Sequence, residues 1–237
     1  AGAKVAKHGN RSVSSKSGAA DVLERLGVKI QTTPEQAANC IHEIGISFLF
    51  AQSYHGSMKY VAKARKEMGT RTVFNILGPL ANPAETDILL GVYSDDLIPV
   101  MAKVLCGLGI RHAMVVHGED GFDEISISAP TKVAEIKDGG IFEYTITPEQ
   151  FGLPLAEKEE VVGGSPEENA LITQGILAGT IRDAKRNIVL LNAGCALYVV
   201  GQAGSIGDGV ALAAEMIDSG AALAKLEELK QFTNALA

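Results

Sequence analysis

Apolar residues recur along this chain with two alternating periods. In seven segments they return about every 3.6 residues, which is typical of a helix with one buried face. These predicted helices are Ser17–Leu26, Pro34–Ile44, Ser57–Met68, Ile98–Leu108, Glu167–Ala178, Ile181–Val200 and Gly209–Leu229.

Shorter runs between these helices are apolar or alternate between apolar and polar residues, as β-strands do. They are Ala3–Ala6, Phe48–Ala51, Ile88–Val92, Ala113–Val116, Glu124–Ser128, Thr131–Ile136 and Phe142–Ile146. Strands that alternate with helices predict an α/β fold, with a central, mostly parallel sheet flanked by helices. The later strands follow one another without a helix, so we expect them to pair antiparallel at one edge and to make the sheet mixed.

Two local sequence features, a helix cap and a glycine within a helix, are interpreted as structural and not as parts of a functional site. Ser165 is placed to cap a helix, with Pro166 at its first position and Glu168 three residues after the cap. In the helix that follows, Gly194 suits close packing against a neighbouring element.

The composition is that of a globular protein. Of the 237 residues, 46% are hydrophobic and 21% are charged, which excludes a disordered or low-complexity chain. A formal charge of −7 gives no overall attraction to polyanions or membranes, so we expect neither a nucleic acid nor a membrane as partner. The longest uncharged stretch, Asn187–Gly207, is interrupted by polar residues and glycines, and its apolar part is too short for a span.

The cysteines and the start of the chain bear on its compartment. Cys40, Cys106 and Cys195 lie far apart and form neither a zinc motif nor a disulfide framework, so we expect buried thiols in a reducing cytoplasm. The chain begins without a methionine or a signal-peptide pattern, directly at a predicted strand, and we therefore expect further sequence upstream.

A basic segment rich in glycine and serine connects the first predicted strand to the first helix. It spans Lys7–Gly18 and reads KHGNRSVSSKSG, with four cationic or histidine side chains and no acid. Backbone N–H groups at a helix start, hydroxyls and cations all favour bound phosphate. A solvated basic turn in which Ser17 caps the next helix explains the same residues, and both interpretations stay open.

An acidic segment follows the buried strand that ends at Val116. Gly118–Glu124 reads GEDGFDE, and its adjacent Asp123 and Glu124 are oxygen ligands of the type that Mg²⁺ prefers. A solvated acidic turn is the alternative. If both segments are sites, a basic phosphate loop and an acidic metal loop together indicate a metal-chelated polyphosphate substrate.

A cationic segment, Ser57–Arg71, is preceded by His55 and precedes Gly78-Pro79-Leu80-Ala81-Asn82-Pro83. Its Arg65 is suited to hold a carboxylate in bidentate fashion, whereas the simpler interpretation is a solvated cationic face. A histidine such as His55 is, taken alone, more often structural than catalytic, and the sequence shows no Ser/His/Asp arrangement. The whole stretch Ser57–Pro83 differs enough from its surroundings to indicate a separate helical lobe.

These segments together resemble the anthranilate phosphoribosyltransferase family, which is related to the pyrimidine nucleoside phosphorylases. The resemblance runs from Lys4 to about Leu229. It rests on KHGNRSVSSKSGAADVLE from Lys7, FAQSYHGSMKYVAKARKEMGTRTVFNILGPLANP from Phe50, the pair Asp123-Glu124, and GGSPEENA from Gly163.

The resemblance implies a fold of two parts. The large α/β phosphoribosyl-binding domain would comprise residues 1–54 and 84–237, and residues 55–83 would be part of a small helical lobe. The family's upstream helices and glycine-rich pyrophosphate loop are absent from these residues. Members of the family are usually homodimers joined through the helical lobe.

The resemblance also implies a reaction: transfer of the 5-phosphoribosyl group from phosphoribosyl pyrophosphate to the amine of anthranilate, with two Mg²⁺ ions, in tryptophan biosynthesis. It implies no covalent catalytic residue, since positioning and electrostatics carry the reaction. The implied phosphoribosyl pyrophosphate-binding residues are Lys7, Gly9, Asn10, Ser12 and Ser15. The implied anthranilate-binding residues are His8, Asn10, His55, Arg65 and Gly78, and the implied magnesium ligands are Asp123 and Glu124.

Two alternative functions share the implied fold. A pyrimidine nucleoside phosphorylase would split a nucleoside with phosphate and would need no metal pair at Asp123 and Glu124. A non-catalytic relative that binds nucleic acid would use the cationic helix, although an intact Arg65, Asp123 and Glu124 argue against it.

Overall fold

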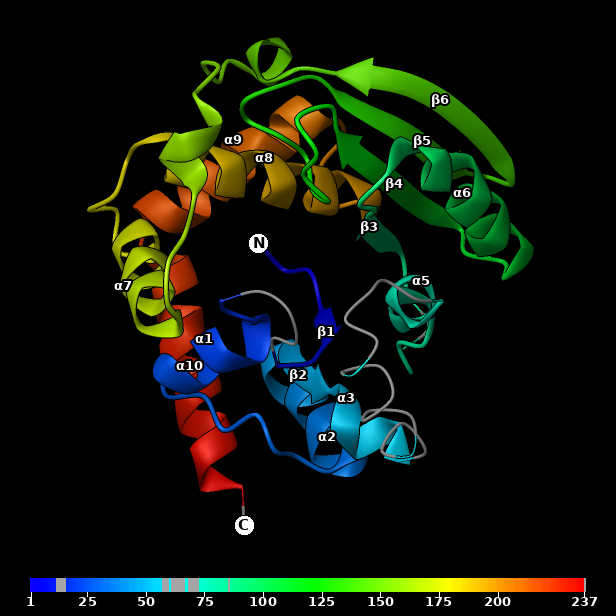
Figure 1. Cartoon of the computed structure of the whole chain (residues 1–237). Coiled ribbons are helices and arrows are strands. Elements are labelled where there is room, and N and C mark those ends of the chain that lie inside the picture. The colour runs from blue at the N-terminus through cyan, green and yellow to red at the C-terminus, as the bar shows by residue number, and fades with distance from the viewer. Residues whose placement is uncertain (12–15, 57–59, 61–66, 68–72, 85, 237) are drawn as a thin grey trace. The chain divides into compact units, whose positions relative to one another are not determined.

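The computed structural model describes residues 1–11, 16–56, 60, 67, 73–84 and 86–236 (Figure 1). The chain divides into two compact units. Unit 1 comprises Ala1, Glu85–Val162 and Ala178–Ser219, and unit 2 comprises Gly2–Ala84, Gly163–Leu177 and Gly220–Ala237. The predicted boundary between a large and a small lobe, around residues 55–83, lies partly outside the described residues and stays a prediction.

Unit 2 contains a short parallel sheet surrounded by helices. Strands β1 (Val5–Gly9) and β2 (Ile46–Phe50) pair in parallel, with Gly9 opposite Phe50. The helices are α1 (Ala19–Arg25), α2 (Pro34–Ile44), α3 (Ala51–Tyr54), α5 (Phe74–Leu80), α7 (Pro166–Leu177) and α10 (Ala221–Ala235). Helix α7 contacts α1 and α10, and α10 also contacts α2, which itself packs on β2.

Helix α2 has the bounds that the sequence predicts, because its end signals are strong. The Thr33 hydroxyl accepts a hydrogen bond from the N–H of Gln36, whose side chain accepts one from the N–H of Thr33. Pro34 occupies the first turn, and Gly45 ends the helix in the left-handed region at φ 80°. The apolar face joins a core of Ala20, Leu26, Val28, Ile30, Cys40, Ile44, Phe48, Phe50, Ala170, Leu226 and Leu229.

Unit 1 contains a mixed sheet with strand order β3-β4-β5-β6. Strand β3 (Ile88–Gly91) pairs in parallel with β4 (His112–Gly118), while β5 (Thr131–Lys137) and β6 (Gly140–Ile146) continue antiparallel. Its helices are α6 (Ile98–Gly107), α8 (Ala184–Val199) and α9 (Ile206–Asp218), with short 3₁₀ turns η2 (Asp95–Leu97), η3 (Pro148–Phe151) and η4 (Lys158–Val161). Helix α6 contacts β4 and β5, and α8 contacts β3 and β4 (Figure 1).

The predicted α/β class and the antiparallel pairing of the later strands are confirmed. In β4, the residues from Ala113 to Gly118 are all buried, as expected of a strand that is covered on both faces. The close packing predicted at Gly194 is also confirmed, because a Cβ there would lie 2.6 Å from the backbone nitrogen of Val210 on α9. The Ser165 cap forms as predicted, since its hydroxyl accepts from the N–H of Glu168 at 3.2 Å.

Two predicted elements are wrong, and the bounds of a third are displaced. The apolar pattern from Gly209 to Leu229 is not one helix, because Gly220 takes the left-handed conformation at φ 79° and separates α9 from α10. The run Glu124–Ser128 is not a strand. Its backbone bonds mainly to side chains instead: Asn192 bonds both the N–H and the carbonyl of Ile125, at 3.0 and 2.8 Å, while the carbonyl of Ile127 accepts from the N–H of Ala156. The first strand lies later than expected, at Val5–Gly9.

Two further helical segments differ from the predicted elements or cannot be compared with them. The pattern does not predict helix α5, because its glycine and proline weaken the apolar periodicity. Most of the predicted helix Ser57–Met68 lies outside the described residues. Among the helices that the structure describes, none combines the length and apolar character needed to cross a membrane.

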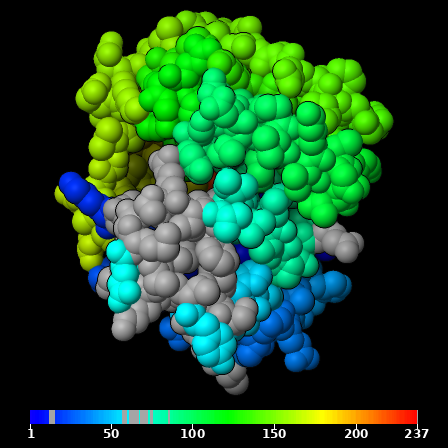
Figure 2. All heavy atoms as spheres, turned by 45° about the vertical axis from the view of Figure 1, so that its right-hand side comes forward, coloured from blue at the N-terminus to red at the C-terminus, as the bar shows by residue number. Residues whose placement is uncertain are grey.

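Helix α6 is apolar on two faces. Met101, Ala102 and Leu105 are buried. The helix also lies at the surface of unit 1 (Figure 2), where Val100 and Leu108 are 51% and 61% exposed. Periodicity therefore predicts the helix correctly, but it understates how much apolar surface the helix leaves in contact with solvent.

Candidate active site

The basic segment begins where β1 ends. Lys7 and Asn10 are exposed, and His8 and Gly9 are half-buried. A Cβ added to Gly9 would lie 3.1 Å from the ring of Phe48 on β2, so the strand crosses this ring where a side chain would be crowded. The carboxyl ends of the parallel strands β1 and β2 therefore bring Lys7 to Asn10 next to the chain that follows Phe50.

Three of the predicted anthranilate-binding residues meet at this end of β1. The Nε2 atoms of His8 and His55 are 3.1 Å apart, and the rings are nearly perpendicular, with centroids 5.0 Å apart. His8 also makes a hydrogen bond with the backbone of Gly78 on α5, and Tyr54 lies edge-on to its ring at 6.5 Å.

The electrostatics of this histidine cluster favour a neutral His8. Burial, the neighbouring His55 and Lys7 lower the pKa of His8 below 6.5, although the hydrogen bond with Gly78 opposes the shift. A hydrogen bond between two imidazole nitrogens needs one donor and one acceptor. His8 is engaged by both contacts, and its tautomer decides which of the two Nε2 atoms donates.

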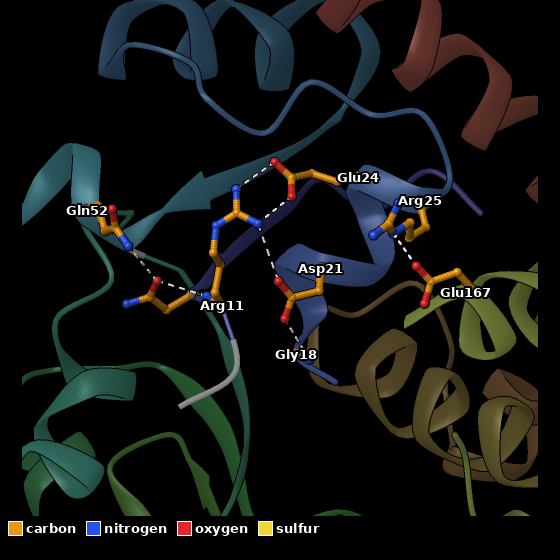
Figure 3. A network of polar contacts seen from close by, with 8 residues as sticks. Arg11, Gly18, Asp21, Glu24, Arg25, Gln52 and Glu167 are labelled. Atoms are coloured by element: carbon orange, nitrogen blue, oxygen red, sulfur yellow. Dashed lines mark hydrogen bonds and ion pairs between the residues drawn. The ribbon is translucent and has the colours of Figure 1, made fainter. Parts of the chain in front are cut away.

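Arg11, which follows these residues, is held by acids of α1 (Figure 3). Its guanidinium donates to both carboxylate oxygens of Glu24, with 2.7 Å between Nη2 and Oε1, and to Asp21 at 3.4 Å. The other Asp21 oxygen accepts from the N–H of Gly18 at 3.0 Å. Arg11 therefore has its charge compensated, and composition alone overstates the cations available to a phosphate.

The Asn10 side chain is oriented from both sides. Its Oδ1 accepts a hydrogen bond from the Arg11 N–H at 2.8 Å and a longer one from Gln52 Nε2 at 3.4 Å. The predicted site residues Ser12, Ser15 and Arg65 lie outside the described residues.

The acidic segment after β4 folds around one of its own carboxylates. Asp120 Oδ2 accepts hydrogen bonds from the hydroxyls of Ser126, at 2.6 Å, and Ser128. Burial disfavours the charged form, but these hydroxyls, the N–H of Phe122 and the charge of Lys158 outweigh it and lower the pKa of Asp120. Asp120 therefore acts as the centre of the loop.

Asp123 and Glu124 are exposed on the same loop. The backbone beneath them is closely packed, because a Cβ on Gly91 of β3 would lie 1.7 Å from the Asp123 carbonyl oxygen. Two adjacent exposed carboxylates on a constrained backbone fit a hard divalent cation that keeps several waters and contacts substrate oxygens. Among the residues that the structure describes, no cluster of three or more His, Cys, Asp or Glu side chains is placed to hold a metal. The residues present therefore fit a shared magnesium site better than a closed protein cage.

Sequence reasoning misses the residues that shape the two segments. It treats Asp120 as one more acid and does not single out Glu24. Asp21 and Glu24 are three residues apart on α1, which places their carboxylates on one helix face beside an arginine-containing segment. Sequence reasoning also gives no role to Asn82. Its Nδ2 donates to the carbonyl of Ala6 on β1 at 3.1 Å.

Comparisons with known proteins agree with these observations. Residues 1–223 match the glycosyl transferase family, a/b domain. The anthranilate phosphoribosyltransferase of Methanobrevibacter smithii is 53% identical over 236 residues, which cover 99% of this chain and 70% of that protein. The enzyme of that name from Lacticaseibacillus paracasei is 54% identical over 234 residues, with 98% and 68% covered.

Solved structures are similar over the same length. The anthranilate phosphoribosyltransferase of Thermus thermophilus superposes with a TM-score of 0.92 at 44% identity, and the match covers 99% of this chain and 70% of that one. The enzyme from Saccharomyces cerevisiae in complex with PRPP and Mg has a TM-score of 0.90 at 30% identity, with 98% and 66% covered. None of these relatives is a nucleoside phosphorylase or a nucleic-acid-binding protein. The chain belongs to the anthranilate phosphoribosyltransferase family.

Proposed function

We propose that this protein transfers the 5-phosphoribosyl group from phosphoribosyl pyrophosphate to the amine of anthranilate, in tryptophan biosynthesis. The structural observation that carries the proposal is the meeting of His8, His55 and Gly78 at the end of β1, beside Gly9 and Asn10. Family membership supplies the substrates, because the relatives bear the enzyme's name and one is in complex with PRPP and Mg.

The chemistry suits a site without a strong base. The bond between the sugar C1 and pyrophosphate breaks, the bond between C1 and the anthranilate nitrogen forms, and the nitrogen loses one proton. Positive charge develops at C1, as in other glycosyl transfers. An aromatic amine is nucleophilic when neutral, so the protein mainly has to position it and to stabilise the departing pyrophosphate.

We assign the proposed residues to the two substrates. Phosphoribosyl pyrophosphate is bound by Lys7, Gly9 and Asn10, together with Ser12 and Ser15. Anthranilate is bound by His8, Asn10, His55, Gly78 and Arg65. The exposed Lys7 and the half-buried, neutral His8 support this division, because an ammonium suits a phosphate and a neutral imidazole suits an amine.

Asp123 and Glu124 are the proposed ligands of Mg²⁺, and we propose two ions. When bound, magnesium supplies positive charge that stabilises the pyrophosphate leaving group. The exposure of both carboxylates supports the role, because ions shared with a substrate need ligands that the substrate can reach.

The assembly and the compartment belong to the same proposal. The family resemblance supports a homodimer joined through the helical lobe. The thiols support a reducing cytoplasm: Cys40, Cys106 and Cys195 are free, and burial raises the pKa of Cys195 to about 12, which keeps it in the unreactive protonated form.

The test is the loss of anthranilate fluorescence on addition of phosphoribosyl pyrophosphate and Mg²⁺, with and without a chelator. We expect a loss that the chelator abolishes and that Arg65→Ala strongly reduces. Phosphate-dependent splitting of a pyrimidine nucleoside, or a gel shift with oligonucleotides at moderate salt in place of turnover, would contradict the proposal. Unchanged turnover in Arg65→Ala would remove Arg65 from the anthranilate site.

A further inference from the structure

Helix α1 holds both described ends of the basic segment through two carboxylates. Glu24 accepts both guanidinium nitrogens of Arg11, and Asp21 takes Arg11 on one oxygen and the N–H of Gly18 on the other (Figure 3). We refer to Arg11, Asp21 and Glu24 as the α1 clamp. It connects the residue after Asn10 directly to the first turns of the helix.

The α1 clamp has a planar geometry that other cations cannot reproduce. A bidentate pair between guanidinium and carboxylate fixes orientation as well as distance, whereas a lysine ammonium is a point charge. The guanidinium also lies 5.8 Å from the centroid of the Phe50 ring, on the strand that pairs with β1. Arg11 is therefore held between α1 and the end of β2.

The backbone of Arg11 orients its neighbour. Asn10 Oδ1 accepts the Arg11 N–H at 2.8 Å and the Gln52 amide at 3.4 Å, which occupies both lone pairs of this oxygen. Among the described residues, the Asn10 Nδ2 group has no partner. The Nδ2 group can therefore donate to an acceptor such as a phosphate or carboxylate oxygen.

We infer that Arg11 is a positioning residue of the proposed active site: through Asp21 and Glu24 it fixes the residue that follows Asn10, so that Asn10 presents its amide NH₂ to a substrate oxygen. This inference rests on the proposed function. Arg11 itself touches no substrate, since its guanidinium is engaged by the two acids.

A second ion pair on α1 provides the matched control. Arg25 Nε lies 2.8 Å from Glu167 Oε1, and both side chains are more than half exposed. The pair joins α1 to α7, on the side of the helix away from Arg11 (Figure 3). Arg25→Lys therefore removes a guanidinium that pairs with a different carboxylate, without disturbing the α1 clamp.

The experiment compares Arg11→Lys and Arg25→Lys in steady-state kinetics and in hydrogen exchange of residues 7–11 and 16–24. Because a substrate-binding donor is misplaced, Arg11→Lys should raise KM for phosphoribosyl pyrophosphate about tenfold and change kcat less than about twofold. Exchange of the Arg11 and Gly18 amides should become faster in this variant only. Arg25→Lys should change KM less than about twofold.

A second variant tests the orientation of Asn10 without touching the clamp. Gln52→Glu replaces the donor that faces Asn10 Oδ1 by an acceptor, which favours rotation of the amide and withdraws Nδ2 from the substrate. It should raise the same KM more than Gln52→Met does. Thermal melts of all variants identify any that fail to fold.

The outcomes separate this inference from the proposed function. If the wild-type protein shows no turnover, the proposed function fails, and faster exchange in Arg11→Lys alone still supports the clamp. Equal exchange in Arg11→Lys and Arg25→Lys, or a lower kcat at unchanged KM, overturns the assignment of Arg11. A KM for Gln52→Glu that matches Gln52→Met overturns the orientation of Asn10.

Discussion

The basic segment after β1 and the acidic loop after β4 are organised in the same way, although their charges are opposite. In each, one charged side chain is held by hydrogen bonds, while Lys7 in the first and Asp123 and Glu124 in the second are exposed. Arg11 shapes the basic segment through two acids of α1, and Asp120 shapes the acidic loop through two serine hydroxyls. The composition of a charged loop therefore overstates the groups available to a ligand, because part of the charge serves the fold.

The two shaping residues differ in their surroundings. Ser126, the partner of Asp120, is 0% exposed, whereas the side chains of Arg11 and Glu24 are 39% and 36% exposed. Partly buried hydrogen bonds to a charged group contribute more than exposed ion pairs, which water and salt screen. We expect Asp120 to matter chiefly for stability and Arg11 chiefly for orientation.

The largest expected effect is on stability in the acidic loop. Asp120→Ala removes the acceptor of two hydroxyls and one N–H, and should cost about 3 kcal/mol in the free energy of unfolding. Glu119→Ala, at the adjacent exposed acid, is the control and should cost less than about 0.5 kcal/mol. Urea denaturation with an unchanged m-value measures both. Equal values for the two variants would mean that Asp120 does not centre the loop.

Asp123→Asn should show the opposite behaviour. Because the side chain is exposed, stability should change by less than about 0.5 kcal/mol. Turnover should fall about a hundredfold at low Mg²⁺ and recover in part as Mg²⁺ is raised, since a weaker ligand set needs more metal. Titrations of turnover against Mg²⁺ measure the effect, with Glu119→Gln as the control. Insensitivity to Mg²⁺ would place the metal elsewhere.

The α1 clamp should contribute less to stability than Asp120 does. Glu24→Ala should lower the free energy of unfolding by about 1 kcal/mol, and Glu167→Ala, which breaks the exposed pair with Arg25, by about 0.3 kcal/mol. Both losses should shrink in high salt, because the pairs are exposed. A loss for Glu24→Ala as large as that for Asp120→Ala would remove the contrast between the two segments.

The smallest expected effect is the pH dependence of the acidic loop. The pKa of Asp120 is lower in the folded protein than its ordinary value of 3.8, so the folded state favours the charged form. Its contribution is complete above that ordinary value and is lost as pH falls through the folded pKa. Asp120→Asn should flatten the decline of stability below about pH 4, relative to wild type, in acid denaturation followed by circular dichroism. An unchanged decline would assign the acid sensitivity to other carboxyls.

Local signals predicted much of the fold, and their failures have physical causes. Helix α2 has a capping box, a first-turn proline and a terminal glycine, and its bounds are as predicted. The alternating run Glu124–Ser128 resembles a strand, yet Asn192 and Thr131 bond to its backbone in place of a neighbouring strand. These partners are distant in sequence or are side chains, so hydrophobic periodicity cannot predict them.

The sequence by itself determined the α/β class, most helices and the identity of the two charged segments, because spacing, caps and composition are local properties of the chain. It also carried the resemblance that named the substrates and the histidines. Only the tertiary structure decided that His8 meets His55 and Gly78, that Arg11 is held by α1, and that Asp120 serves the loop. Each of these contacts depends on the distance between a side chain and a group on another part of the chain. Tertiary packing sets that distance.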